Sequence, residues 1–180
     1  YLNFSKSHDQ AAVRRALAGA CVHMQFVAEL YHEQLEGNRY FLHEHPRYAT
    51  SWQLECMKRL EDIPGVQTVR GDQCQYGAVA SRGPNQGSPV KKPSGFMSNS
   101  PEIRRALSCV CSGVNGMCTR PGGGKHTTVQ GNITKGTQRY PRELCRAVLR
   151  GLTAELRADR RLIAGCYGIQ ARDAGLDSAT

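Results

Sequence analysis

The chain has 180 residues, of which 39% are apolar, and its 24 lysines and arginines outnumber its 15 aspartates and glutamates to give a formal net charge of +9. A chain of this length forms one domain with a hydrophobic core. No stretch approaches the about 18 uninterrupted apolar residues of a membrane-spanning helix, and no charged-then-apolar leader is visible, so the sequence predicts an intracellular protein, nuclear or cytoplasmic, and not a membrane or secreted one.

The first predicted element is a long amphipathic helix over residues 9–36. Ser7 or Asp9 can cap its start, and Gly37 ends it. Apolar residues recur at steps of three and four along one face, as expected of a helix that packs on a core: Val13, Leu17, Ala20, Met24, Val27, Tyr31 and Leu35.

Helices and strands alternate in the following part of the chain. The predicted elements are strand 39–43, helix 50–62, strand 66–70, strand 95–98, helix 101–107 and a last helix opened by Pro141, with Gly-rich loops over 72–93 and 109–138. This alternation predicts a parallel sheet with helices packed on it, whose ligands lie beyond the carboxyl ends of the strands. Glu44 and Asp72 follow predicted strands, so they mark the expected edge of a site.

Four stretches, taken in order, resemble DNA cytosine-5 methyltransferases. Glu44-His45-Pro46 after its strand resembles the family's Glu-Asn-Val or Glu-Asn-Pro motif, and "TVRGDQCQYGAV" (68–79) resembles a strand with its Tyr-Gly loop. "VKKPSGFMSN" (90–99) resembles the next basic stretch and strand, and "QRYPRELCRAVLRGL" (138–152) resembles the closing motif. The likeness is greatest to small phage-type members and to methyltransferase-like segments of retroelement polyproteins.

The resemblance implies an α/β fold that is the carboxyl-terminal half of a Rossmann-like, methyltransferase-type three-layer sandwich, with few strands and long Gly-rich loops. Residues 1–157 would form this half-domain, and residues 100–138 would be a basic recognition insert within it. Residues 158–180 lack a convincing pattern and are expected to be a poorly ordered tail.

The resemblance also implies chemistry. The whole enzyme would transfer a methyl group from S-adenosylmethionine to cytosine in DNA, with the base swung out of the duplex. Glu44 would be catalytic, because a carboxylic acid at the ring nitrogen stabilises the charge that develops in the ring. Tyr140 and Pro141 would lie beside the cofactor.

The chain departs from the family in three respects. It has neither the Pro-Cys nucleophile nor a strand-linked Gly-X-Gly loop, and His45 stands at the position of the family's Asn. We therefore expect a fragment or a degenerate domain, inactive alone, that needs the upstream part of the same polypeptide for the nucleophile and for most of the S-adenosylmethionine site.

A metal-like constellation lies in the second Gly-rich loop, where Cys109-X-Cys111-X6-Cys118-X7-His126 offers three thiolates and an imidazole. Such a set can close a tetrahedral zinc site and order a loop that lacks a core. The alternatives are free thiols, since Cys-X-Cys spacing is atypical of zinc, and a disulfide framework, for which the chain is large.

Basic residues are concentrated in one segment. Residues 82–150 contain twelve lysines and arginines and two glutamates, which sums to +10 and leaves −1 for the remainder. This footprint favours DNA as a partner. The residues expected to contact it are Arg82, Lys91, Lys92, Arg104, Arg105, Arg120 and Lys125.

Two further interpretations stay open. The chain can be a non-catalytic nucleic-acid-binding module, zinc-stabilised, of a retroelement-type polyprotein. The basic segment can also be an ordinary solvated surface.

Overall fold

The computed structural model describes residues 9–127 and 139–161. In chain order the elements are α1 (Gln10–Glu36), β1 (Leu42–Pro46), the 3-10 helix η2 (Thr50–Gln53), α2 (Glu55–Glu61), β2 (Gln67–Asp72), η3 (Gln73–Tyr76), β3 (Pro93–Ser98), α3 (Pro101–Leu107), η4 (Val114–Gly116) and α5 (Arg142–Ala158). Helices and strands mix as predicted, so the α/β character is confirmed. The predicted tail, residues 158–180, lies outside the described residues from position 162 on.

The strands form a three-stranded sheet in the order β1-β3-β2, and both pairings are antiparallel. The predicted parallel sheet is therefore wrong, and a Rossmann-like fold is not confirmed. β1 and β2 do run in the same direction, as the β1-α2-β2 alternation predicts, but β3 pairs between them. This strand order depends on contacts between residues far apart in the sequence, and a local sequence pattern does not reveal such contacts.

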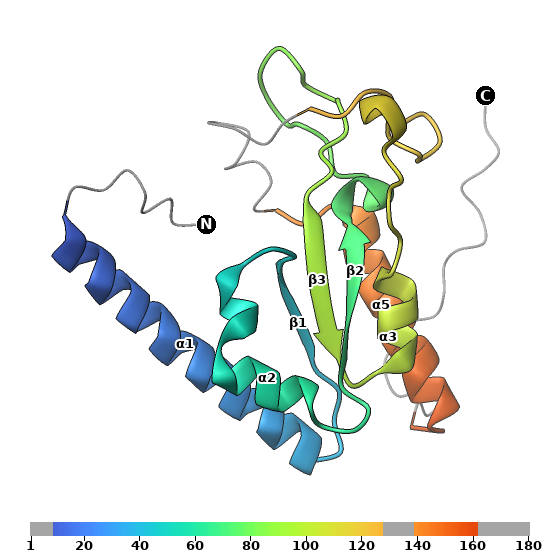
Figure 1. Ribbon diagram of the computed structural model, residues 1–180. Coiled ribbons are helices and arrows are strands. Elements are labelled where there is room, and N and C mark those ends of the chain that lie inside the picture. Colours follow the sequence, from blue (N-terminus) through green and yellow to red (C-terminus); the bar gives the residue numbers. More distant parts are fainter. Residues whose placement is uncertain (1–8, 128–138, 162–180) are drawn as a thin grey trace.

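Helices cover both faces of this sheet, which gives three layers (Figure 1). On one face, Met97 packs with residues of α1, α2 and their connections: Met24, Ala28, Phe41, Met57, Leu60 and Val66. On the other face, Phe96 packs with η3, α3 and α5: Tyr76, Ile103, Leu107, Leu144 and Ala147. Because Phe96 and Met97 are adjacent on β3, their side chains point to opposite faces and divide the core in two.

The first residues of two helices are fixed by capping residues that can be recognised in the sequence. The Asp9 carboxylate accepts the N–H groups of Ala11 and Ala12 at 2.9 and 3.0 Å, which satisfies donors at the start of α1. At the start of α3, Ser100 Oγ accepts the N–H of Ile103 at 3.1 Å and Pro101 occupies the first turn. Both helices were predicted within one residue of these bounds.

The first strand begins later than predicted. Residues 39–41 are held by a side chain instead of a strand partner, because Asn99 accepts the Phe41 N–H at 3.1 Å and donates to the Arg39 carbonyl at 3.0 Å. Pairing with β3 begins at Leu42 and continues to Pro46, with Glu44 opposite Phe96. Glu44 therefore lies within the strand and not beyond its carboxyl end.

The last helix packs on the core through part of its apolar face, where Leu144 is buried and Val148 and Leu152 are partly buried against the same cluster. Its buried residues are Leu144, Ala147, Gly151 and Glu155, while Cys145 and Leu149 are exposed. A Cβ at Gly151 would lie 2.7 Å from the Ile103 Cα, so this glycine lets α5 approach the α3 backbone closely. Glu155 accepts hydrogen bonds from the Ser100 hydroxyl and, at 2.9 Å, from the Glu102 N–H, and so ties α5 to the start of α3.

Candidate functional site

Three cysteines and one histidine converge beyond the end of β2. The ligand atoms of Cys74, Cys111, Cys118 and His126 all lie within 4.8 Å of one another, and the three thiols are buried. Ligands on a tetrahedral zinc ion, at bonds of about 2.3 Å, are about 3.8 Å apart. The Cys111 Sγ and His126 Nε2 atoms are 3.6 Å apart. The four side chains thus form a Cys3His cluster of the size that a metal ion requires.

The cluster unites three separate segments of the chain. Cys74 comes from η3, directly after β2; Cys111 follows α3; and Cys118 and His126 flank a tight loop closed by the Met117–Lys125 bridge. The Cys118 N–H donates to the Gly124 carbonyl, and the His126 N–H donates to the Gly116 carbonyl, both at 2.8 Å. We call residues 118–126 the knuckle.

Glycine is required within the knuckle. A Cβ at Gly123 would lie 2.7 Å from the Cys118 Cβ and 3.0 Å from its sulfur. Gly122 and Gly124 have φ of 68° and 73°, in the left-handed region that glycine adopts most readily. The Gly-Gly-Gly run therefore lets the chain turn closely around the Cys118 thiol.

Hydrogen bonds prepare two of the ligands for a cation. His126 Nδ1 lies 2.9 Å from the Gly116 carbonyl, which can only accept, so Nδ1 carries the proton and Nε2 keeps its lone pair toward Cys111. The Thr119 N–H and hydroxyl both reach the Cys111 Sγ at 3.4 Å. Burial opposes ionisation of Cys111, but these bonds from Thr119, followed by hydrogen bonds with Cys74 and Cys118, lower its pKa to about 6.

The pKa of Cys74 is shifted in the opposite direction to that of Cys111. Burial, followed by a hydrogen bond with Cys118, raises the pKa of Cys74 to about 12. This thiol keeps its proton until a cation competes for the sulfur, so a metal that bound here would release a proton. Thiolate and imidazole ligands in a closed set suit zinc.

Asp72 anchors the cluster to the sheet. Its carboxylate is fully buried and accepts the Cys111 N–H at 2.9 Å and the Arg70 Nη2 at 3.2 and 3.3 Å, with the Lys91 Nζ at 4.0 Å. The end of β2 therefore fixes Cys111 directly. Sequence reasoning marked Asp72 as a strand-end residue but did not give it this role.

The structure replaces one predicted metal ligand. Cys111, Cys118 and His126 are brought together, but Cys109 is exposed and Cys74 takes its place. The Cys109 N–H donates to the Tyr76 hydroxyl at 3.1 Å, and its carbonyl accepts the Asp72 N–H at 2.9 Å. The backbone N–H and carbonyl of Cys109 are thus hydrogen-bonded to η3 and β2. In this backbone position its side chain lies in solvent. Cys74 lies in the predicted loop a few residues beyond the strand predicted over 66–70, and this place at the expected edge of a site was the signal that could have identified it.

The seven described cysteines are all free thiols, so the disulfide alternative finds no pair among them. Cys21 and Cys145 are exposed, and Cys56 is partly buried against the core. The buried faces of α1 and α5 lie at Met24 and Leu144 instead.

Glu44 faces a second site. Its Oε1 accepts the Ser94 hydroxyl at 2.6 Å and the Gln73 amide at 3.3 Å, and its Oε2 accepts the Tyr140 hydroxyl at 2.7 Å. Burial and the bond to Glu44 raise the pKa of Tyr140. A cavity of about 380 Å³ opens beside these groups, and its other lining residues are apolar or thiol side chains: Leu42, Phe96, Leu144, Cys145, Val148 and Leu149.

The residues flanking Glu44 and Tyr140 have other surroundings. His43 is buried on the opposite face of β1, as the alternation of side chains along a strand requires, with Nδ1 3.1 Å from the Tyr31 hydroxyl. Burial lowers the pKa of His43 to about 4, and burial also lowers the pKa of His45. Pro141 forms the amino-terminal cap of α5 and does not line the cavity, so of the predicted cofactor residues only Tyr140 faces it.

The seven basic residues predicted to bind nucleic acid have unequal positions. Arg82 and Lys125 are exposed, Lys91 and Arg120 are partly buried near the cluster, and the Lys92 Nζ lies 6.0 Å from the centre of the Tyr140 ring. Arg105 is exposed and paired with Glu102 at 2.7 Å. Arg104 instead donates to the carbonyls of Gly65 and Ser98 at 2.8 and 2.7 Å, which makes it a structural link between α3 and the strands.

No known protein family, curated protein or solved structure matches the chain. In the part of the chain that the structure describes, no helix combines the length and the apolar character needed to cross a membrane.

Proposed function

We propose that the chain is a zinc-stabilised module that binds nucleic acid. The observation that carries this proposal is the Cys3His cluster, which fixes loops bearing basic side chains. Zinc would be held by Cys74, Cys111, Cys118 and His126. When bound, it would cross-link η3, the chain after α3 and the knuckle, and so replace the apolar core that these loops lack.

Charge supports a polyanionic partner. The segment 82–150, which includes the knuckle, sums to +10, whereas the remaining residues sum to −1. Lys125 projects from the knuckle, and Arg82 lies in the exposed loop that precedes β3. Cations on a rigid loop neutralise backbone phosphates at a smaller entropic cost than cations on a mobile one.

Binding to a short DNA duplex and to single strands, measured by fluorescence anisotropy across a series of salt concentrations, tests the proposal. We expect affinity to fall steeply with salt. Lys125→Gln and Arg82→Gln should each reduce the slope of log K against log salt by about 1 and weaken binding at every sequence alike. Lys58→Gln, an exposed lysine on α2, is the matched control and should leave the slope unchanged.

Absence of salt-dependent binding, or an equal effect of the α2 control, would contradict this function. Arg104 is unsuitable as a probe, because its substitution removes two hydrogen bonds to backbone carbonyls.

Methyl transfer is the second candidate function. It is favoured by the Glu44 carboxylate, which faces an apolar cavity between Gln73 and Tyr140. In this proposal the chain is the carboxyl-terminal part of an S-adenosylmethionine-dependent DNA cytosine-5 methyltransferase-like domain, and Glu44 stabilises charge on the cytosine ring. The antiparallel pairing of the sheet departs from the Rossmann-like fold that the resemblance implies.

Transfer of a labelled methyl group to DNA distinguishes the two functions. The chain alone should show no turnover in either case. Joined to a preceding segment that supplies the nucleophile and most of the S-adenosylmethionine site, it should methylate DNA only in the second case, and Glu44→Gln should then lower turnover by about 100-fold or more while salt-dependent binding is kept.

A further inference from the structure

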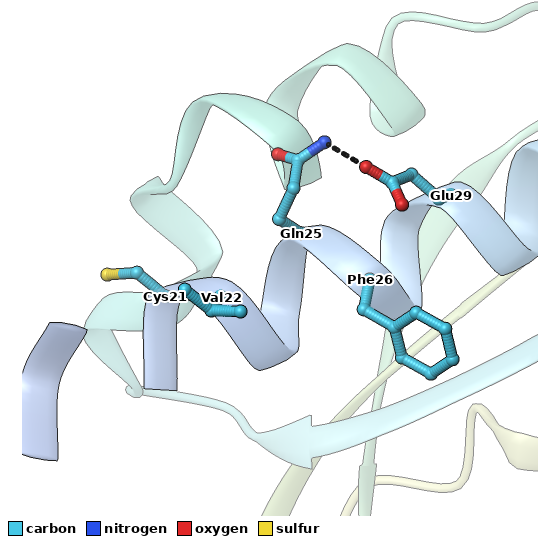
Figure 2. A pocket seen from close by; sticks show the side chains of 5 residues that line it. All are labelled: Cys21, Val22, Gln25, Phe26 and Glu29. Carbon is cyan, nitrogen blue, oxygen red and sulfur yellow. Dashed lines mark hydrogen bonds between the residues drawn. The ribbon is translucent and has the colours of Figure 1, made fainter. Parts of the chain in front are cut away.

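The face of α1 that points away from the core carries exposed apolar side chains. Val22 is 71% exposed, Phe26 is 54% exposed and Leu30 is 38% exposed. These residues follow one another at steps of four and so share one face of the helix. Figure 2 shows Val22 and Phe26 beside an open hollow of about 440 Å³, and all five of its lining residues belong to α1. The hollow is therefore a shallow, open surface of one helix.

Most of α1 lies outside the two cores. Met24 and Ala28 are its only buried residues among those described, and Leu17 on the core-facing side is still 48% exposed. Figure 1 shows the amino-terminal half of α1 extending past α2 and the sheet. Helices in proteins owe most of their stability to packing of an apolar face, so this half lacks its expected source of stability.

The outer face has the spacing of a helix-pairing seam. Ala12, Arg15, Gly19, Val22 and Phe26 recur at alternating steps of three and four, as do positions at the interface of a coiled coil. Gly19 is destabilising within a helix relative to alanine. A Cβ at Gly19 would meet nothing within 4 Å, so packing within this chain does not require a glycine there. A side chain from another helix can occupy that space.

The charges of α1 indicate the direction of the partner. Arg14 and Arg15 lie in the amino-terminal half, and Glu29, Glu33 and Glu36 lie in the carboxyl-terminal half. A helix dipole favours the reverse order, with acids near its start and bases near its end. A second helix running antiparallel would place its acids beside these arginines and its arginines beside these acids.

We propose that the chain forms a homodimer through antiparallel pairing of α1 with α1 of a second copy. Placing Gly19 of one copy opposite Phe26 of the other lets the phenyl ring fill the space that the glycine leaves open. Arg15 then lies opposite Leu30, flanked by Glu29 and Glu33. This surface is separate from the Cys3His cluster, and the proposal goes beyond nucleic-acid binding.

Sedimentation velocity of the 180-residue protein over a range of concentrations tests the dimer. We expect a reversible monomer–dimer equilibrium, and Phe26→Glu should raise the dissociation constant by about 30-fold or more, the effect of losing a central anchor residue. Val114→Glu replaces an apolar side chain that is 66% exposed outside α1, and it should leave the equilibrium unchanged. Circular dichroism checks that both variants keep their helices.

A charge reversal tests the antiparallel direction. Arg15→Glu should weaken the dimer by about 5-fold or more, because the new glutamate faces Glu29 and Glu33, and the triple variant with Glu29→Arg and Glu33→Arg should restore it. In a parallel pair like residues would face each other, and neither variant would change the affinity. A protein that is monomeric at every concentration, or a dimer unaffected by Phe26→Glu, would overturn the proposal.

Discussion

Cys74 and Cys109 are matched probes of the metal site, because each is a cysteine near the end of β2 but only one belongs to the cluster. We predict that Cys74→Ser lowers zinc affinity by more than about 100-fold, since a hydroxyl cannot replace a thiolate ligand. This loss exceeds the one expected from substituting a residue that only hydrogen-bonds to a ligand. Cys109→Ser should retain one zinc per chain, because the Cys109 side chain is exposed. Mass spectrometry of metal content after dialysis measures both.

The opposite pattern of metal content would decide against the cluster. If Cys109→Ser lost zinc and Cys74→Ser kept it, the ligand set indicated by the sequence, with Cys109, Cys111, Cys118 and His126, would be restored. If neither variant changed the metal content, the cluster would be a group of buried thiols packed around Cys111.

The interface between α1 and the sheet contains the most strongly perturbed histidine, and it makes the packing of these elements sensitive to pH. His43 lies on β1, 7% exposed, with Tyr31 of α1 at its Nδ1 and Trp52 of η2 against its ring. Burial lowers its pKa to about 4. An unfolded histidine titrates near pH 6.5, so between these values only the unfolded chain binds the proton.

We therefore predict that the free energy of unfolding is highest above about pH 6.5 and decreases as the pH falls toward 4, with His43 contributing a loss of roughly 3 kcal/mol. His43→Gln should remove much of this pH dependence, since the amide does not titrate but can still hydrogen-bond the Tyr31 hydroxyl. Urea unfolding at several pH values measures it. His32→Gln, exposed on α1, is the control, and equal pH dependence in the His43 variant and the unsubstituted protein would contradict the assignment.

Elements with strong local signals could be predicted from the sequence, and the assembly of those elements could not. Asp9 and Pro101 marked the starts of α1 and α3 because caps act within one turn. The insertion of β3 between β1 and β2 is not local, since it brings Phe96 opposite both Glu44 and Val69. Knowledge of one strand pair would have been needed to reject the parallel sheet.

At the scale of the whole molecule, the part of the candidate site that is local in sequence could likewise be predicted, and the part that depends on assembly could not. Cys111, Cys118 and His126 lie close in sequence, and their spacing was enough to predict a metal site. Cys74 reaches the cluster only because β2 ends beside the chain that follows α3, where the Asp72 carboxylate accepts the Cys111 N–H. Tyr140 meets Glu44 across a long separation in sequence, and there the order of the motifs was the guide.

Two apolar cores hold the helices and the sheet, whereas the buried cluster around the candidate metal consists of three cysteines. Removal of the metal should therefore unfold one part of the molecule and leave the rest folded. We predict that a chelator accelerates hydrogen exchange at the amides of Cys118 and His126, whose hydrogen bonds close the knuckle, while the amides of β3 stay protected.

The helical circular dichroism signal should persist, and affinity for nucleic acid should fall because the basic loops lose their fixed geometry. Exchange measured by mass spectrometry with and without chelator, and on Cys74→Ser, checks this. Equal acceleration in β3 would mean that the metal supports the whole fold, and no acceleration anywhere would mean that the cluster holds no structural metal.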